Sequence, residues 1–299
     1  MRELLLTNIL VLKWVVSMLQ TITLVTGNNM PVLVANQPEL GKTTEKRLSI
    51  QADLNGFSFS VTEESRKKVL YLFKSDFNWD KGHTDIFLRH VDNCIKSQPI
   101  LKKQYSSVDI IYDTHKYVLI PRQLYKKGEE LQYLTKLYTL DDLEEIDIVE
   151  VASEEIVIIF AVNSTFLQKI REVQPSFRIF PAIYPVMVHS SDFNEINKIF
   201  FKYNKGETSI IIYEDKRLAF CNNFPAQHFN TALYYLFLAL KQVQFNPEQT
   251  TVFVSGSMPE SEISNITKYF SKVRYLRNVE IPLQDANFEM QLALLTFSL

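Results

Sequence analysis

Two stretches of the 299-residue chain repeat the same alternation of apolar and polar residues, and each predicts three successive β-strands. The first begins at Leu48 with LSIQADLNGFSFSVTEE, turns at residues 64–67 and continues as VLYLF; the second begins at Ile199 with IFFKYNKGETSIIIYEDKRLAFCNNF. Alternation with period two is typical of strands with one buried face. Placing Asn204 on Asp53, 151 residues earlier (204 minus 53), also aligns Gly206 with Asn55, Ile210 with Phe59 and Ile212 with Val61. The repeat predicts a duplicated meander over residues 48–74 and 198–224.

The segments around the meanders predict an α/β protein with two lobes. After the first meander, the patterns predict helices over 83–96, 122–137 and 165–173, a hairpin around 113–115, an acidic loop at 141–145 and a buried strand at 156–162. After the second, they predict helices over 226–243 and 261–271, strands at 250–256 and 277–281, and a last helix from about 287. We therefore expect one lobe at residues 48–195 and another at residues 196–299.

The first 47 residues precede this pattern, and we expect them to form an N-terminal extension and a linker. Leu4 to Val25 is mostly apolar and long enough to cross a bilayer. Lys13 stands at its centre, however, and a central lysine costs about 2.5–3.5 kcal/mol on insertion. A membrane tether is expected only if residues 4–25 are expressed, and a start at Met18 or Met30 would remove most or all of them.

Charge, cysteines and motifs narrow the function. The 32 basic and 34 acidic side chains nearly balance, so we expect no nucleic-acid partner. Cys94 and Cys221 stand far apart, which favours a reducing compartment and hence the cytoplasm. Gly41-Lys42-Thr43 is like the end of a P-loop, but Asn36 stands where that motif needs its first glycine. The histidines have no spacing typical of a metal site, and we expect none.

Three turns carry the residues that suggest a ligand site. The first meander turns at Asp53-Leu54-Asn55-Gly56, the second turns at Asn204-Lys205-Gly206 before Thr208, and a buried strand ends at Ser255-Gly256-Ser257. With these turns in this order, the chain resembles the actin-like ATPase superfamily, whose lobes are ribonuclease-H-like. The likeness covers residues 48 to 285. It is greatest to a bacterial family of unknown function assigned to this fold, and it extends distantly to the actin-like proteins of type IV pilus assembly.

The resemblance implies a two-lobed actin-like ATPase fold in which the turns surround Mg²⁺ and a nucleotide. It makes nine residues candidates for nucleotide or anion binding: Asp53, Asn55, Gly56, Asn204, Gly206, Thr208, Ser255, Gly256 and Ser257. Two of them depart from the superfamily pattern. Asn55 stands where a phosphate loop uses glycine, and Asn204 is neutral where an acid would support the metal. A simpler interpretation is that glycine and asparagine are the residues that tight turns use.

These departures favour a protein without catalysis, and we expect no catalytic residues and no required cofactor. The first hypothesis is an actin-like interaction scaffold that binds a protein partner. The alternative is a nucleotide-binding switch with weak or no ATPase activity, in which Mg²⁺ and ATP would bind the turns. A third hypothesis is a phosphotransferase like the sugar and acetate kinases of the superfamily, but of the acid pair that this chemistry needs, only Asp53 is present.

Overall fold

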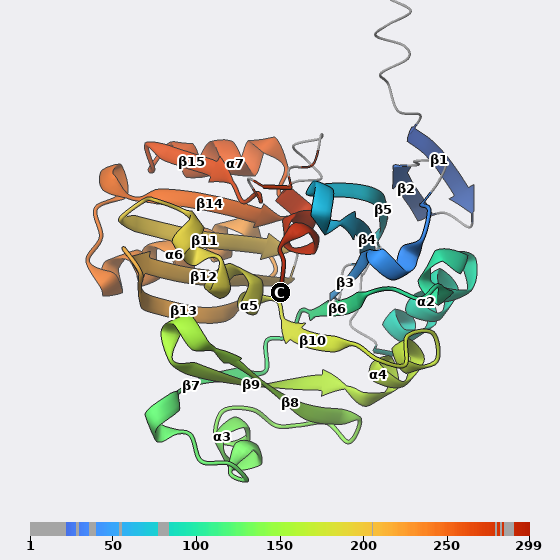
Figure 1. Cartoon of the computed structure of the whole chain (residues 1–299). Helices are drawn as coiled ribbons and strands as arrows, with labels where there is room; N and C mark the ends of the chain where they lie inside the picture. Colours follow the sequence, from blue (N-terminus) through green and yellow to red (C-terminus); the bar gives the residue numbers. More distant parts are fainter. Residues whose placement is uncertain are drawn as a thin grey trace, which may run out of the picture.

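The computed structural model describes residues 22–27, 30–35, 40–53, 56–76, 84–204, 206–278, 280–281, 283 and 290–299 (Figure 1). The described residues form three β-sheets of seven, five and three strands. The five-stranded sheet lies beside the seven-stranded sheet, and the three-stranded sheet lies below them in the view of Figure 1. We call the seven-stranded sheet with its helices the first lobe and the five-stranded sheet with its helices the second lobe.

The first lobe contains the first predicted meander. Its strands β3 (Arg47–Asp53), β4 (Gly56–Glu63) and β5 (Lys68–Asp76) pair antiparallel, and two parallel strands, β6 (Ser107–Tyr112) and β10 (Arg178–Pro181), continue the sheet beyond β3. The order is therefore β5-β4-β3-β6-β10. Leu48, Ile50 and Ala52 on one face of β3 are fully buried, and Ser49 and Gln51 on the other face are buried too, so β3 is covered on both faces and not on one as its alternation predicts.

The second lobe repeats this order strand for strand. It consists of β11 (Asn197–Asn204), β12 (Gly206–Glu214), β13 (Arg217–Ala226), β14 (Thr251–Gly256) and β15 (Lys272–Tyr275), in the order β13-β12-β11-β14-β15. The pairing keeps the 151-residue offset, since Asp53 lies opposite Gly56 and Asn204 lies opposite Glu207. Even the irregularity between Val61 and Thr62 has its counterpart between Ile212 and Tyr213. The two predicted meanders thus lie in separate, equivalent sheets.

Helices occupy equivalent places in the two lobes. Helix α2 (Thr84–Ser97) connects β5 to β6, and α6 (Phe229–Val243) connects β13 to β14. Helix α4 (Ser164–Arg171) precedes β10, and α7 (Glu260–Thr267) precedes β15. The Phe87 ring of α2 lies 5.8 Å from the Phe166 ring of α4, and both belong to the first hydrophobic core. A short helix, α5 (Ile183–Val188), follows β10 near the connection to the second lobe.

The first lobe carries an insert that the second lobe lacks among its described residues. The insert, residues 113–163, contains β7 (Tyr117–Pro121), α3 (Glu130–Thr135), β8 (Glu144–Val151) and β9 (Ile156–Asn163), with the strands in the order β7-β9-β8. The expected hairpin around 113–115 is wrong, because β6 and β7 belong to different sheets. The expected helix over 122–137 is reduced to α3 and a 3₁₀ turn at Arg122–Leu124, because Gly128 takes φ 93° between them.

The N-terminal region differs from the expected linker. Strands β1 (Ile22–Gly27) and β2 (Met30–Ala35) form a hairpin, and β2 pairs with β5 at the edge of the first lobe's sheet. The apolar run that follows Pro31 finds a partner because β5 offers an open edge, which local sequence does not reveal. Most of the apolar segment from Leu4 lies outside the described residues. Among the described helices, none is long and apolar enough to cross a membrane.

The C-terminal residues lie on the first lobe, not on the second. Residues 290–299, with a 3₁₀ turn at Ala293–Thr296, cover the face of β3 and β4 opposite the Leu48 side chain. Of the expected helix from about 287, only residues 290–292 are α-helical among those described, and a 3₁₀ turn follows them. The expected strand at 277–281 is also wrong, since β15 ends at Tyr275.

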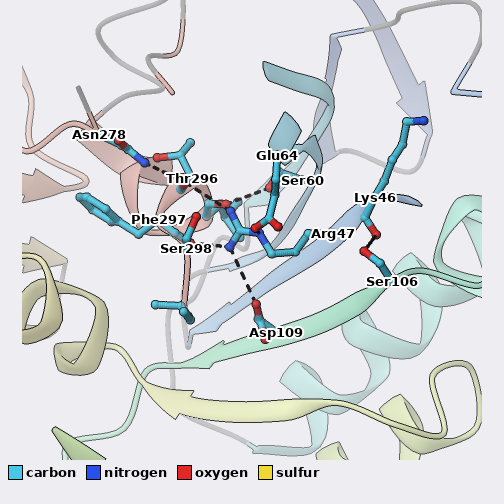
Figure 2. Close-up of polar contacts among 12 residues, drawn as sticks. Lys46, Arg47, Ser60, Glu64, Ser106, Asp109, Asn278, Thr296, Phe297 and Ser298 are labelled. Atoms are coloured by element: carbon cyan, nitrogen blue, oxygen red, sulfur yellow. Dashed lines mark hydrogen bonds and ion pairs between the residues drawn. The ribbon is translucent and has the colours of Figure 1, made fainter. Parts of the chain in front are cut away.

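A buried arginine holds this C-terminal segment (Figure 2). The Arg47 guanidinium donates to the carbonyl oxygens of Phe297 and, at 3.3 Å, Thr296. It also lies 3.0 Å from the Glu64 carboxylate and 3.8 Å from that of Asp109. Because Arg47 is only 1% exposed, these partners replace the hydrogen bonds that water would otherwise form with the guanidinium. The last residues of the chain are thereby held against the first core.

Candidate functional site

The predicted turns meet where the two lobes face each other. A cavity of about 30 Å³ lies between them, lined by Gln51, Asp53, Gly56, Ser58, Lys74, Lys202, Asn204, Gly256, Ser257, Gln291 and Leu292. Five of the nine candidate residues line this cavity: Asp53, Gly56, Asn204, Gly256 and Ser257. Ser255 lines a neighbouring cavity of about 20 Å³, Gly206 and Thr208 line neither, and Asn55 lies outside the described residues. Such volumes hold one or two water molecules.

A lysine that the sequence did not single out lies between the turns. The Lys202 ammonium of β11 forms an ion pair with the carboxylate of Asp113, which follows β6 in the first lobe. Lys202 lines both small cavities. Burial disfavours its charge, but Asp113 and Asp53 outweigh that effect and raise the pKa of Lys202. A cation of the second lobe therefore pairs with Asp113 of the first lobe and lies near Asp53.

A third carboxylate lies beside this ion pair. Glu207 accepts a hydrogen bond of 2.6 Å from the Asn223 amide, and Asn223 accepts one of 2.9 Å from the Tyr117 hydroxyl of the insert. Burial and the charge of Asp113 raise the pKa of Glu207 to about 7, although Lys202 opposes them. The first lobe, the insert and the second lobe are thus joined through one polar network.

Asn204 has a structural contact in place of the metal role that the resemblance implies. Its side-chain oxygen accepts a hydrogen bond of 3.0 Å from the backbone N–H of Ser257. Gly256 takes φ 93° at this point, and a Cβ there would lie 2.2 Å from the carbonyl oxygen of Tyr203. The end of β14 is therefore packed directly on the end of β11, which only glycine permits.

The remaining residues of the second turn also serve the backbone. The Thr208 hydroxyl donates to the carbonyl oxygen of Lys202 at 2.8 Å. Gly206 has φ 111°, in the left-handed region where glycine is favoured. The interpretation of these residues as ordinary turn residues accounts for each of these contacts.

The described residues around this cavity, as they are arranged, do not fit a Mg²⁺-nucleotide complex. The cavity is of water size, the acid beside it has the Lys202 cation close by, and the amide that replaces the second acid is bound to Ser257. In the part of the chain that the structure describes, no three His, Cys, Asp or Glu side chains are grouped to hold a metal. His90 is buried against the Ser75 hydroxyl at 2.9 Å, and burial lowers the pKa of His90 to about 4.

Comparison with solved structures identifies the fold. A protein of unknown function with an actin-like ATPase fold from Bacteroides thetaiotaomicron VPI-5482 is similar with a TM-score of 0.70 and 20% identity, over 80% of this chain and 95% of that chain. The PilM-PilN type IV pilus biogenesis complex contains a similar chain with a TM-score of 0.55 and 10% identity, over 85% of this chain and 97% of that one. At these identities the likeness concerns the fold alone, and the expected two-lobed actin-like ATPase fold is confirmed.

Comparison by sequence gives the family. No curated protein matches the chain. Residues 35–279, which include both meanders and the insert, match the family described as Protein of unknown function (DUF3822). The chain belongs to this DUF3822 family of actin-like ATPase fold.

Proposed function

We propose that this chain is a non-catalytic actin-like protein, a pseudo-ATPase that acts as a scaffold for a protein partner. The observation that carries the proposal is the Lys202 ammonium between the lobes, ion-paired with Asp113. It stands among acids at the meeting point of the turns, where a catalytic member of such a fold would need space and free carboxylates for a metal ion. An internal cation makes that metal unnecessary for charge balance.

Phosphoryl transfer demands more than this arrangement provides. Its transition state is stabilised by metal ions and by groups positioned around the transferred phosphoryl group. Asp53 has a cation nearby, and Asn204 is engaged with the Ser257 N–H. Neither turn therefore offers a free carboxylate that could hold a metal ion beside the phosphates, and we expect no ATPase activity.

A protein partner and a cytoplasmic location complete the proposal. One similar structure is a complex, PilM-PilN, which supports the idea that this fold can serve in a protein assembly. Cys94 and Cys221 are both free, and burial raises the pKa of each thiol to about 12, so neither is a reactive thiolate. Free, inert thiols fit a reducing compartment.

A nucleotide-binding switch is the second candidate. The observation that favours it is that Asp53, Gly56, Asn204 and Gly256 still meet at one interlobe cavity. Separation of the lobes would break the Lys202–Asp113 ion pair and enlarge that cavity. A nucleotide would then have to supply more binding energy than the closed network loses.

Phosphate release from ATP tests the proposal on the full chain. We expect no turnover above background for the wild type, and the same for Asp53→Ala and for Asp85→Ala, an exposed control on α2 of the same lobe. Turnover near about 1 s⁻¹, the low end for enzymes, that is lost in Asp53→Ala and kept in Asp85→Ala, would show that the cleft is catalytic.

A further inference from the structure

The insert presents a free sheet edge. In the described part of the chain, β8 pairs with β9 alone, so its other side has no strand partner. The Ile148 N–H donates to the Asp147 side chain at 2.7 Å and the Glu144 N–H donates to the Asp141 carbonyl, so neither amide is used by β9. Because amides of an antiparallel strand alternate in direction, the even-numbered residues of β8 turn theirs to the open side. This edge can accept another strand.

Exposed apolar side chains lie on the insert, and one of them, Ile148, is on the edge strand itself. Helix α3 packs on β7 and β9, with Leu134 beside Val118 and Ile159 in one cluster, and leaves part of β8 uncovered. Ile148 is therefore 41% exposed, although it lies on the face of the sheet that α3 covers elsewhere. The insert also carries four exposed leucines: Leu124, Leu131, Leu137 and Leu143. An edge strand that only avoided pairing would not need an exposed isoleucine at its centre.

The charge of this edge defines what can bind it. Residues 141–155 contain eight acidic side chains and no basic one. Lys116 pairs with Asp141 and Glu144, and Arg122 pairs with Glu150, but Glu145 forms no ion pair within the described residues. Two copies of such an edge would repel each other, as would nucleic acid or an anionic membrane. The complementary occupant is basic.

We propose that the free edge of β8 binds an extended segment of a partner protein by β-strand addition, and that this segment alternates basic and apolar residues. Basic side chains on one face would meet Glu145 and Asp147, and apolar side chains on the other would cover Ile146 and Ile148. Backbone hydrogen bonds would supply affinity and the alternation would supply specificity. The proposal rests on the proposed scaffold function and names the chemistry of its partner.

Fluorescence anisotropy with a labelled Lys-Val octapeptide tests this on the full chain. We expect saturable binding that weakens with salt, and none for the matching Glu-Val octapeptide. Ile148→Pro removes an outward N–H that no neighbouring strand uses, so it should leave the fold intact and reduce affinity at least about tenfold. Glu145→Lys should weaken binding several-fold, whereas Glu248→Lys, an exposed control in the second lobe, should not.

Amide hydrogen exchange of the wild-type chain gives an answer that does not depend on the folding of any variant. The Lys-Val peptide should slow exchange over residues 144–150 and leave α6 of the second lobe unchanged. Absence of binding, protection elsewhere without protection of β8, or full binding by folded Ile148→Pro would each overturn the proposal. None of these results would alter phosphate release, so failure of this site is distinguishable from failure of the non-catalytic function.

Discussion

The two lobes are alike at the outer ends of their first strands and different at the cleft. Arg47 begins β3 and Lys198 stands 151 residues later near the start of β11. We call these two residues the outer cations. Both are buried cations that donate to backbone carbonyls: Arg47 to Thr296 and Phe297, and Lys198 to Phe193 at 2.6 Å. In the first lobe the cation holds the C-terminal segment, which follows the second lobe in the chain. In the second lobe the cation holds the segment at Phe193, which connects the first lobe to the second.

At the cleft the same offset pairs unlike residues. Gln51 of the first lobe corresponds to Lys202 of the second, and Asp53 corresponds to Asn204. At these two equivalent positions the first lobe has an amide and an acid, and the second has a cation and an amide that is bound to the Ser257 N–H. The buried cations far from the cleft thus hold segments of backbone in both lobes, whereas at the cleft a cation of the second lobe pairs with an acid of the first.

Removal of the first outer cation should have the largest effect. Arg47→Met leaves the buried Asp109 carboxylate with Arg178 alone and removes the donor to two C-terminal carbonyls. Loss of one partner of a buried ion pair costs about 3–5 kcal/mol of unfolding free energy. Urea unfolding measures it, with Arg66→Met as control, because that exposed pair with Glu63 is worth no more than about 1 kcal/mol. Equal losses for both variants would refute the structural role of Arg47.

The second outer cation should matter less. Lys198 is 2% exposed and donates to one carbonyl oxygen, that of Phe193, and burial lowers the pKa of Lys198. Lys198→Met should cost about 1–3 kcal/mol, the penalty for leaving a buried acceptor unpaired. The same urea titration, with exposed Lys241→Met on α6 as control, checks this. A loss as large as that of Arg47→Met would contradict the expectation that the outer cation with fewer partners contributes less to stability.

The cleft cation should couple the lobes by a smaller amount. Lys202→Met removes the cation that pairs with Asp113 and leaves that carboxylate near Asp53 and Glu207. Because the pair is partly exposed, we expect a loss of about 1–2 kcal/mol of unfolding free energy. In a double-mutant cycle with Asp113→Leu, the double variant should lose less than the sum of the single losses. Additive losses would show that the pair does not connect the lobes.

The smallest expected effect is a pH dependence from Glu207. Its pKa is raised in the folded chain from 4.5 to about 7, so between these values the folded state binds more protons than the unfolded state. Its contribution to stability is therefore present below about pH 4.5 and is lost as pH rises to about 7. Glu207→Gln should make the change in unfolding free energy across this window smaller by on the order of 1 kcal/mol.

Glu248→Gln, an exposed variant on the second lobe, is the matched control for this pH dependence. It should leave the wild-type change unaltered. The same pH profile for wild type and Glu207→Gln would contradict the raised pKa and, with it, the burial of Glu207 near the charge of Asp113.

The sequence predicts those parts of this molecule that depend on local pattern. The two meanders alternate over neighbouring residues, so their strands and the 151-residue offset were predictable. That the turns at Asp53 and Asn204 meet was implied only by the resemblance to the actin-like fold. Strand β2 was missed because its strand status depends on the open edge of β5. The resemblance to a known fold supplied the ligand hypothesis, but it could not reveal which turn residues are already engaged with the backbone.

The partners of the two most informative cations lie far away in the sequence. Lys202 meets Asp113 at a separation of 89 residues, and Arg47 meets Phe297 at a separation of 250. The one local signal was polar residues inside buried strands, as in IFFKYN, because a lysine on such a strand needs a partner. That signal identifies a buried cation but not the acid that pairs with it, so the pairing of Lys202 with Asp113 could be found only in the structure.

The most direct test is isothermal titration calorimetry of Mg²⁺-ATP into the full wild-type chain, with Lys202→Met and Asp53→Ala in parallel. It asks whether the Lys202 ammonium, paired with Asp113, stands in place of a metal-bound nucleotide in the cleft. We expect no saturable heat for the wild type at ATP concentrations up to about 1 mM, a limit that corresponds to about 4 kcal/mol of binding free energy. Saturable, Mg²⁺-dependent binding by the wild type that Asp53→Ala abolishes would contradict this expectation, because the cleft would then hold a nucleotide despite Lys202.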